Sequence, residues 1–510
     1  MHVLLLRPVS PNERFGLGPF FRVEPLGLEY IAAALLDQGH RVRIVDLRFA
    51  PGIADALRAD PPDLVGITCA HAVDIPSAIS LAHTIKRAAP QAAVVLGGHA
   101  AAMTPSTFAY HPVDLVCVGD GEHAFPSLTR ALEQRLPLDL VPGFVVPDGD
   151  ACVPTVRESL DLVPLPARHL VAHHRKHYAC VHKMPLWAVE TARGCPHRCS
   201  FCSVWASCGR TFRCRCVDAV CRDFQSVGDN IFVVDDLFWY PYDRSAELAR
   251  ELARRGIRKD WVLVQTRLDT VAKHPTLLEA WRPFARLFDI FFGFEAPRAD
   301  QLRALQKDMS IEAMEEGVAV ARSFGYGVTG NFVVDPDWTE DDFEAMWALV
   351  DRLELNRAGY TILTPLPGTE LFRRWKPRLL DHDWARYDMH HLLFEPRLGR
   401  KRFFELFAES WRRNVLGPRY AGAKWWRWAR ELEPRQALVL ARVLYRTQRM
   451  LDPDAYLRET FPAMVGAPAM PAASATHHAP PRPDSNTGDV LPPARPPTAA
   501  TTKSSSAKHG

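Results

Sequence analysis

The sequence predicts an α/β protein in which two parallel sheets follow one another along the chain. Short apolar runs alternate with helical patterns over about the first 145 residues, and the same alternation resumes near residue 186. Beyond about residue 465 the composition changes to Pro, Ala, Ser and Thr. We therefore expect a doubly wound parallel sheet, then a partial (β/α)6 barrel, a helical C-terminal region and a disordered tail.

The first domain is predicted to span residues 1–145. The predicted strands are residues 2–6, 41–46, 64–68, 93–96 and 113–118. The predicted helices are residues 26–38, ending at Gly39, and residues 75–88. Sheets of this kind bind ligands at the carboxyl ends of their strands.

Small residues follow the last two of these strands and make that edge a candidate site. The candidate contacts are Gly97, Gly98, His99, Gly119 and Gly121. Glycines there let a flat ligand approach the backbone, although ordinary turns use the same residues. The histidines that could face such a ligand are His71, His99 and His123.

A connector with several prolines is predicted over residues 146–185, and a second α/β domain over residues 186–395. Its predicted strands are residues 186–191, 231–234, 261–265, 289–294, 328–334 and 360–363. Its predicted helices are residues 245–255, 275–284, 311–324 and 340–353. Six such units predict a partial barrel whose chemistry lies at the strand carboxyl ends.

The remaining residues divide into a helical region over residues 396–464 and a disordered tail over residues 465–510. The helical region contains an aromatic, basic patch at residues 424–430. Such a patch packs tryptophans against the barrel or lies at a membrane surface, and we favour the first interpretation.

Composition narrows the functional classes. The 510 residues carry a net charge of +3, which gives no reason to expect a nucleic-acid partner. The eleven cysteines are an odd number, and seven of them lie between Cys195 and Cys221, unlike a secreted disulfide framework. No signal peptide and no run near 18 apolar residues is visible. A cytoplasmic protein without a transmembrane segment is predicted.

Three cysteines after the first barrel strand carry the strongest signal, in the spacing C-x3-C-x2-C. These candidate metal ligands are Cys195, Cys199 and Cys202. Thiolates are the usual ligands of iron–sulfur clusters, and three cysteines leave one iron of a four-iron cluster open to a substrate or cofactor. Zinc sites usually combine C-x2-C pairs with a fourth ligand, which fits this spacing poorly.

This run resembles the signature of the radical S-adenosylmethionine (SAM) superfamily, in which an aromatic residue such as Phe201 precedes the third cysteine. The resemblance implies a 4Fe-4S cluster that binds SAM at its open iron and yields a 5′-deoxyadenosyl radical. Polar residues at the strand ends would then meet SAM or substrate, unless they serve as caps or ion pairs. These candidates are Asp235, Asp236, Arg267 and Glu295.

The glycine loops ahead of this core resemble the cobalamin-binding domain of B12-dependent radical SAM enzymes. The resemblance implies a cobalamin-binding, Rossmann-like domain over residues 1–145 and a radical SAM partial barrel over residues 186–395. The D-x-H-x-x-G run that ligates cobalt in other B12 proteins is absent. Either cobalamin binds without that histidine, as is general in the radical SAM branch, or the domain is empty.

Several shorter runs resemble the hopanoid C-3 methylase-like branch, at residues 22–29, 256–259 and 335–338. The resemblance implies a cobalamin-dependent radical SAM methyltransferase acting on an unactivated carbon, with a polycyclic lipid such as a hopanoid as the suggested substrate. One SAM would methylate cobalt and another would supply the radical. The alternatives are an anaerobic oxidative cyclase of the Mg-protoporphyrin monomethyl ester type and, in another class, a cobalamin-binding sensor.

The resemblance also implies partners. An electron donor such as flavodoxin or ferredoxin would reduce the cluster, and a lipid substrate would bring the protein to the inner membrane as a peripheral contact. Four further cysteines match no second-cluster spacing and are interpreted as spare thiols, with a radical trap as the alternative: Cys208, Cys214, Cys216 and Cys221.

Overall fold

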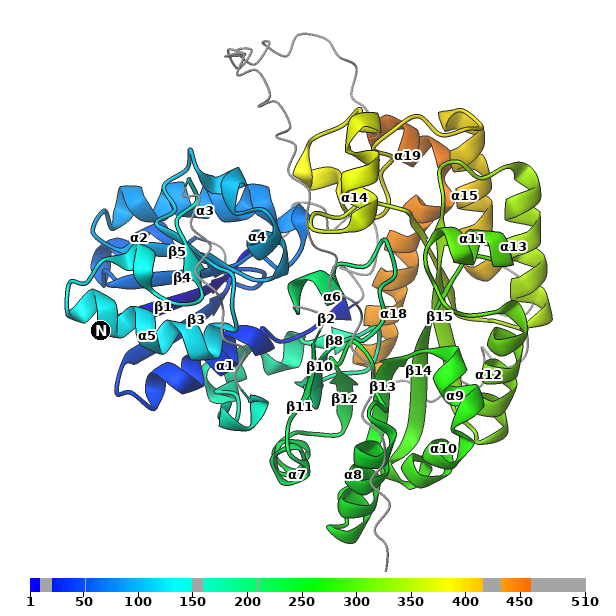
Figure 1. Cartoon of the computed structure of the whole chain (residues 1–510), viewed down its shortest axis with the longest axis horizontal. Helices are drawn as coiled ribbons and strands as arrows, with labels where there is room; N and C mark the ends of the chain where they lie inside the picture. The colour runs from blue at the N-terminus through cyan, green and yellow to red at the C-terminus, as the bar shows by residue number, and fades with distance from the viewer. Residues whose placement is uncertain (10–20, 51, 149–158, 209–210, 416–432, 460–510) are drawn as a thin grey trace, which may run out of the picture. The chain divides into compact units, whose positions relative to one another are not determined.

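The computed structural model (Figure 1) describes residues 1–9, 21–50, 52–148, 159–208, 211–415 and 433–459. The chain contacts group Met1–Pro462 as one compact unit. Among the described residues, no helix combines the length and the apolar character needed to cross a bilayer. The tail predicted over residues 465–510 and the aromatic patch at residues 424–430 lie outside the described residues.

The N-terminal sheet has the strand order β3-β1-β4-β5-β6-β7. Its strands are β1 (His2–Arg7), β3 (Arg41–Asp46), β4 (Leu64–Thr68), β5 (Ala93–Gly97), β6 (Leu115–Cys117) and β7 (Phe144–Val145). All neighbours are parallel except β6 and β7. The five predicted strands are confirmed within a few residues, whereas the two-residue β7 was not predicted.

Alternating side chains of this sheet enter two separate cores, as expected when helices cover both faces. Leu4 and Leu6 join the core formed with α2 (Ala54–Ala59), α3 (Ile75–Ala88) and α4 (His99–Met103). Val3 and Leu5 join the core formed with α1 (Leu26–Leu36) and α5 (Gly121–Glu133). The doubly wound arrangement predicted from the sequence is therefore confirmed.

The second sheet is all parallel, and its six strands pair in chain order. They are β9 (Leu186–Val189), β12 (Asn230–Val233), β13 (Lys259–Thr266), β14 (Ala285–Glu295), β15 (Gly327–Val334) and β16 (Ala358–Ile362). No described residues pair β9 with β16, so the barrel is partial, as predicted.

Helices link the barrel strands, and Figure 1 shows α12 and α13 along the outer side of β14 and β15. The helices of this part are α8 (Tyr242–Arg254), α9 (Leu268–Lys273), α10 (Pro275–Trp281), α11 (Ala299–Ala304), α12 (Ile311–Ser323), α13 (Glu340–Arg352) and α14 (Glu370–Trp375). The described C-terminal helices are α15 (Arg400–Val415), α18 (Pro434–Thr447) and α19 (Pro453–Glu459). The helical character predicted for residues 396–464 is thus present in its described part.

Two small antiparallel pairs supplement the parallel sheets. The strand β2 (Phe21–Arg22) pairs with β8 (Ala179–Cys180), and β10 (Ala192–Gly194) pairs with β11 (Phe212–Cys214). The second pair lies between β9 and α7 (Val217–Ser226) and encloses the three-cysteine loop and α6 (Val204–Ser207). The domain boundaries at residues 145 and 185 stay predictions.

Candidate functional site

The three-cysteine loop follows the first barrel strand, where the sequence predicted it. Gly194 enters the loop with φ +101°, a left-handed value that favours glycine. A Cβ at this position would lie 2.1 Å from the backbone oxygen of Thr211, which belongs to the turn before β11. Only glycine fits here, so the β10–β11 pair holds the loop entrance closely.

Hydrogen bonds fix the rest of the loop to its surroundings. The amide of Cys202 and the indole Nε1 of Trp205 both donate to the carbonyl of Cys199, at 3.1 and 3.0 Å. The amide of Ser200 donates to the Leu305 carbonyl at 3.0 Å, and the Leu371 amide donates to the Ser200 carbonyl at 2.9 Å. The loop is therefore held by α6 and by the segments after β14 and β16.

The three thiols lie in a setting suited to an iron–sulfur cluster. Burial raises the pKa of Cys195 and of Cys199, and burial together with the charges of the other two cysteines raises the pKa of Cys202 to about 12. As thiolates, the three side chains would therefore repel one another. No described group of three His, Cys, Asp or Glu is placed to hold a single metal ion. A cluster does not require this, because each cysteine binds a different iron.

Two buried cations face the cluster loop. Burial has the largest effect on the pKa of Cys199 and raises it. The charges of Lys307 and Arg267 lower this pKa, whereas the charge of Glu295 raises it. The two cations favour thiolates at the loop, and their ion-pair partners Glu295 and Asp269 offset part of this effect. The residues present therefore fit the cluster that the sequence predicts.

Arg267 and Glu295 lie at the carboxyl ends of β13 and β14, but both are already paired. Arg267 Nε donates to Asp269 at 2.8 Å. Lys307 Nζ donates to Glu295 Oε1 at 2.7 Å and to the Gly293 carbonyl at 3.2 Å. Glu295 has φ +63° beside a bulge in the β14–β15 ladder. A strained non-glycine residue is typical of functional sites, and the cofactor contacts of this pair stay predictions.

The two aspartates after β12 differ in their surroundings. Asp235 is fully buried and accepts hydrogen bonds from the Thr191 amide and hydroxyl at 2.7 and 2.6 Å, while burial raises its pKa to about 7. Asp236 is solvent-accessible and accepts a 3.1 Å hydrogen bond from the Gly194 amide, directly before Cys195. Asp235 supports the loop. Asp236 is the accessible member of the pair, although burial of its carboxyl end raises its pKa too, and its contact with a cofactor stays a prediction.

The glycines of the N-terminal sheet have three different uses. Gly98 has φ +103°, and a Cβ there would lie 2.9 Å from the Cys69 carbonyl oxygen. A Cβ at Gly121 would meet Ile31 at 2.6 Å, so this glycine lets α5 pack on α1. Gly97 is the last residue of β5, and the Gly119 amide donates to the Gly143 carbonyl at 3.2 Å. Gly98 therefore lets the end of β5 pack closely against Cys69, the residue after β4, and it is exposed at this edge.

His99 follows Gly98 and supplies a second sign of a ligand at this edge. Its Nε2 is buried and has no hydrogen-bond partner among the described residues. Burial, followed by the charge of His71, lowers the pKa of His99 to about 4. An exposed glycine beside an unpaired buried nitrogen fits a flat ligand with polar edges, as predicted for cobalamin. The roles of these residues as cobalamin contacts stay predictions.

The sequence did not single out the charged residues that join this edge to the cluster loop. Arg193 Nη1 donates to Asp120 at 2.9 Å and to Glu122 at 2.8 Å, and Arg213 Nη1 donates to Asp120 at 2.6 Å. Asp120 and Glu122 were visible inside the Gly-Asp-Gly-Glu run. No pattern along the chain connects them to two arginines more than 70 positions later.

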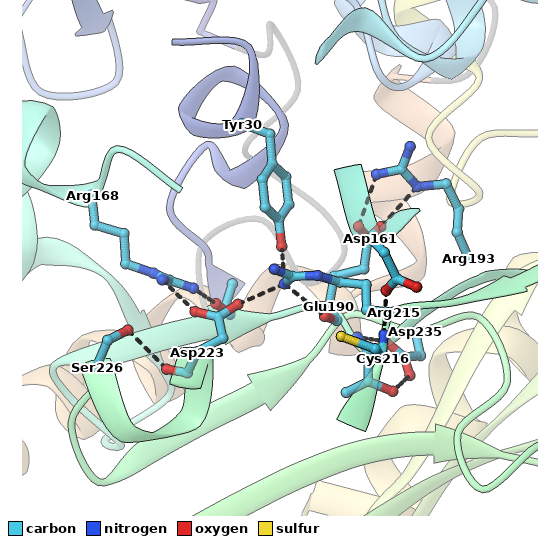
Figure 2. A network of polar contacts seen from close by, with 12 residues as sticks. Tyr30, Asp161, Arg168, Glu190, Arg193, Arg215, Cys216, Asp223, Ser226 and Asp235 are labelled. Carbon is cyan, nitrogen blue, oxygen red and sulfur yellow. Dashed lines mark hydrogen bonds and ion pairs between the residues drawn. The ribbon is translucent and has the colours of Figure 1, made fainter. Parts of the chain in front are cut away.

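A second buried network lies beside the first (Figure 2). Asp223 of α7 accepts from Arg168 Nη1 at 2.6 Å and from Arg215 Nη1 at 3.0 Å, and Arg215 Nη1 also donates to the Tyr30 hydroxyl at 3.0 Å. Glu24 accepts from the Ala188 amide of β9 at 2.7 Å. Glu24, just before α1, is therefore tied to the first barrel strand, whereas Tyr30 within α1 is tied to Arg215 between β11 and α7.

The four other cysteines do not join the loop in a common site. Cys208 lies at the end of α6, Cys214 in β11, Cys216 at the exposed start of α7, and Cys221 on the buried side of α7. Their interpretation as spare thiols stays a prediction.

Comparison with known proteins agrees with this geometry. The family model of the B12 binding domain matches residues 19–129, and that of the Radical SAM superfamily matches residues 189–350. The chain is 32% identical over 423 residues to the hopanoid C-3 methylase of Methylococcus capsulatus, which covers 81% of this chain and 80% of that protein.

Solved structures share the fold. The cobalamin-dependent S-adenosylmethionine radical enzyme OxsB, solved with aqua-cobalamin and S-adenosylmethionine, gives a TM-score of 0.65 at 16% identity over 88% of this chain and 71% of that chain. The radical S-adenosylmethionine methyltransferase TsrM from Kitasatospora setae, solved with cobalamin and a [4Fe-4S] cluster, gives 0.59 at 19% identity over 72% and 73%. The chain therefore belongs to the cobalamin-dependent radical SAM family, as a methyltransferase whose cofactors are cobalamin, SAM and a 4Fe-4S cluster.

Proposed function

We propose that this methyltransferase acts on an unactivated carbon of a polycyclic lipid such as a hopanoid. The observation that carries the proposal is the similarity to the hopanoid C-3 methylase, which extends through both sheets and spans 81% of this chain. The shared layout with TsrM and OxsB supports the fold and leaves the substrate open.

The residues of the barrel prepare the radical half of the reaction. When bound, the cluster and SAM supply a carbon radical, and cobalamin supplies a transferable methyl group. Cys195, Cys199 and Cys202 would hold the cluster. Asp236, fixed beside Cys195 by the Gly194 amide, would accept hydrogen bonds from the amino end of SAM. Asp235 holds the loop entrance through Thr191.

The carboxyl edge of the N-terminal sheet would bind cobalamin for the methyl-transfer half of the reaction. Gly98 would present exposed backbone to a macrocycle, and His99 Nε2 would offer a neutral nitrogen to its polar rim. Because burial keeps the pKa of His99 low, this nitrogen stays uncharged at neutral pH. The edge thus orients a large flat ligand without adding a charge.

The partners follow from the same proposal. The cluster needs a one-electron reductant, for which flavodoxin or ferredoxin is suited, and a polycyclic lipid resides in a membrane. We therefore include a peripheral contact with the inner membrane and a cytoplasmic location in the proposal.

The test is anaerobic reconstitution of the full chain with iron, sulfide, cobalamin, a reductant and SAM carrying a deuterated methyl group, supplied with a hopanoid extract. We expect a hopanoid product whose mass increases by one labelled methyl group, and no such product from the Cys199→Ala variant. An unlabelled, oxidised product would instead support a cyclase. No 5′-deoxyadenosine in the presence of a full cluster would support a sensor, and either result would overturn the proposal.

A further inference from the structure

Arg193 lies close to the cluster loop but has no role in the reaction proposed above. It lies in β10, two residues before Cys195. Its Nε and Nη2 donate to the two carboxylate oxygens of Glu190 at 3.0 and 2.8 Å. Figure 2 shows these two residues beside the buried network of Tyr30 and Arg215. A bidentate pair fixes the plane of the guanidinium, so the direction of Nη1 is fixed as well.

The fixed Nη1 of Arg193 points to the N-terminal sheet, where cobalamin is proposed to bind. Its two acceptors, Asp120 at 2.9 Å and Glu122 at 2.8 Å, lie at the end of β6 and in the first turn of α5. Their side chains are 8% and 6% exposed, and Arg193 is 19% exposed. Ion pairs with so little solvent contact are weakly screened and are costly to break from one side.

The connection from Arg193 to the cluster loop is short and stiff. The next residue, Gly194, has φ +101° and lies too close to Thr211 to accept a side chain. Its amide is held by Asp236, and Cys195 follows. A displacement of Arg193 therefore reaches the first cluster ligand with little backbone freedom in between.

From these contacts we propose that Arg193 is a positioning residue that couples occupancy of the cobalamin edge to the rigidity of the cluster loop. The inference rests on the two cofactor sites of the proposed function. A ligand seated at the Gly98–His99 edge and beside the Asp120 loop restricts the motion of Asp120 and Glu122. Arg193 passes this restriction to Cys195, and by reciprocity a complete cluster favours cobalamin binding.

The test needs neither substrate nor turnover. Full-length protein with a reconstituted cluster is exposed, without oxygen, to an iron chelator, and the loss of cluster absorbance is timed with and without hydroxocobalamin. We expect hydroxocobalamin to slow cluster loss by about fivefold or more in the natural protein. We expect Arg193→Ala to lose most of this protection at hydroxocobalamin concentrations that saturate the variant, since only Arg213 then still donates to Asp120. Arg193→Lys, which keeps the positive charge but lacks the planar guanidinium with its several donors, should restore part of the protection.

Two further variants keep the test decisive. Glu122→Gln preserves the shape at the other end of the contact and removes a carboxylate that accepts from Arg193 at 2.8 Å, whereas Asp120 also accepts from Arg213. This variant should lower the protection as well, and it decides the question if Arg193→Ala does not fold. Arg286→Ala removes an exposed arginine paired with Asp260 at 2.6 Å near the start of β13, away from the strand carboxyl ends. This matched control should keep full protection.

Each result decides. Equal protection in the natural protein and in folded Arg193→Ala would make the contact an ordinary structural ion pair and overturn the inference. A natural protein whose cluster gains no protection would overturn it as well. Failure of the proposed function is distinguishable, because it would show as absent methyl transfer while protection by hydroxocobalamin persists.

Discussion

The cluster loop and the cobalamin edge build their sites in opposite ways. The loop collects its three candidate ligands from one eight-residue run, residues 195–202. The edge collects its candidates from the ends of β5 and β6, which adjoin only because the strands pair. A ligand site within one loop can be recognised from the spacing of its residues. A site along a sheet edge forms only when the strands pair in the right order. The two sites should therefore respond differently to substitution.

The largest effect is expected at the loop. Cys202→Ala should remove the cluster and lower the rate of 5′-deoxyadenosine formation by about 10³-fold or more, because the reaction has no other source of the electron. The measurements are iron per chain and 5′-deoxyadenosine formed under dithionite.

The matched control is Cys208→Ala, a nearby thiol at the end of α6 outside the three-cysteine run. It should keep its iron and its rate. Equal loss in both variants would show that the local spacing does not define the site.

A smaller and more selective effect is expected at the edge. Gly98→Ala places a Cβ 2.9 Å from the Cys69 carbonyl at φ +103°, which should destabilise the N-terminal sheet by about 1–3 kcal/mol. Cobalamin affinity, followed by absorbance, should fall by about tenfold or more, while the iron content of the barrel stays unchanged.

Gly27→Ala is the corresponding control, since a Cβ in this turn of α1 meets nothing within 4 Å. Its stability should be unchanged or about 0.5 kcal/mol higher. Undiminished cobalamin binding by folded Gly98→Ala would show that the ligand does not approach this backbone.

The smallest effect is a pH dependence at His99. Burial lowers the pKa of His99 to about 4, below the ordinary value of 6.5, so the unfolded chain binds a proton between these values and the folded chain does not. The free energy of unfolding should therefore be unaffected above about pH 6.5 and should fall by roughly 2–3 kcal/mol toward pH 4.

Urea unfolding of the natural protein and of His99→Gln at several pH values measures this difference. The variant should lack this part of the slope. Identical slopes would place the unpaired nitrogen in contact with solvent and would remove one reason for a ligand at the edge.

Most parallel strands were predictable because short apolar runs, as in residues 3–6, or apolar residues in alternation, as in residues 41–46, mark them. The 41–46 and 64–68 strands and the 75–88 helix agree with β3, β4 and α3 at both ends. The short pairs β2–β8 and β10–β11 were missed, since two or three residues carry no periodicity. Their formation depends on what the chain packs against.

The candidate site divides along the same line. The cysteine loop could be located from spacing alone, and its place after the first barrel strand agrees with the structure. Spacing could not distinguish Asp235, whose carboxylate accepts hydrogen bonds from Thr191, from its neighbour Asp236. Two adjacent aspartates look alike in the sequence, and only the fold decides in which direction each side chain points.

The sequence by itself determined the order of the two sheets and the three thiols, because strand periodicity and cluster ligation both act over a few residues. Only the tertiary structure decided that Arg193 meets Asp120 and Glu122, that Gly121 serves helix packing and that His99 keeps an unpaired nitrogen. These features depend on which distant side chains share a low-dielectric interior, and no short-range pattern encodes that choice.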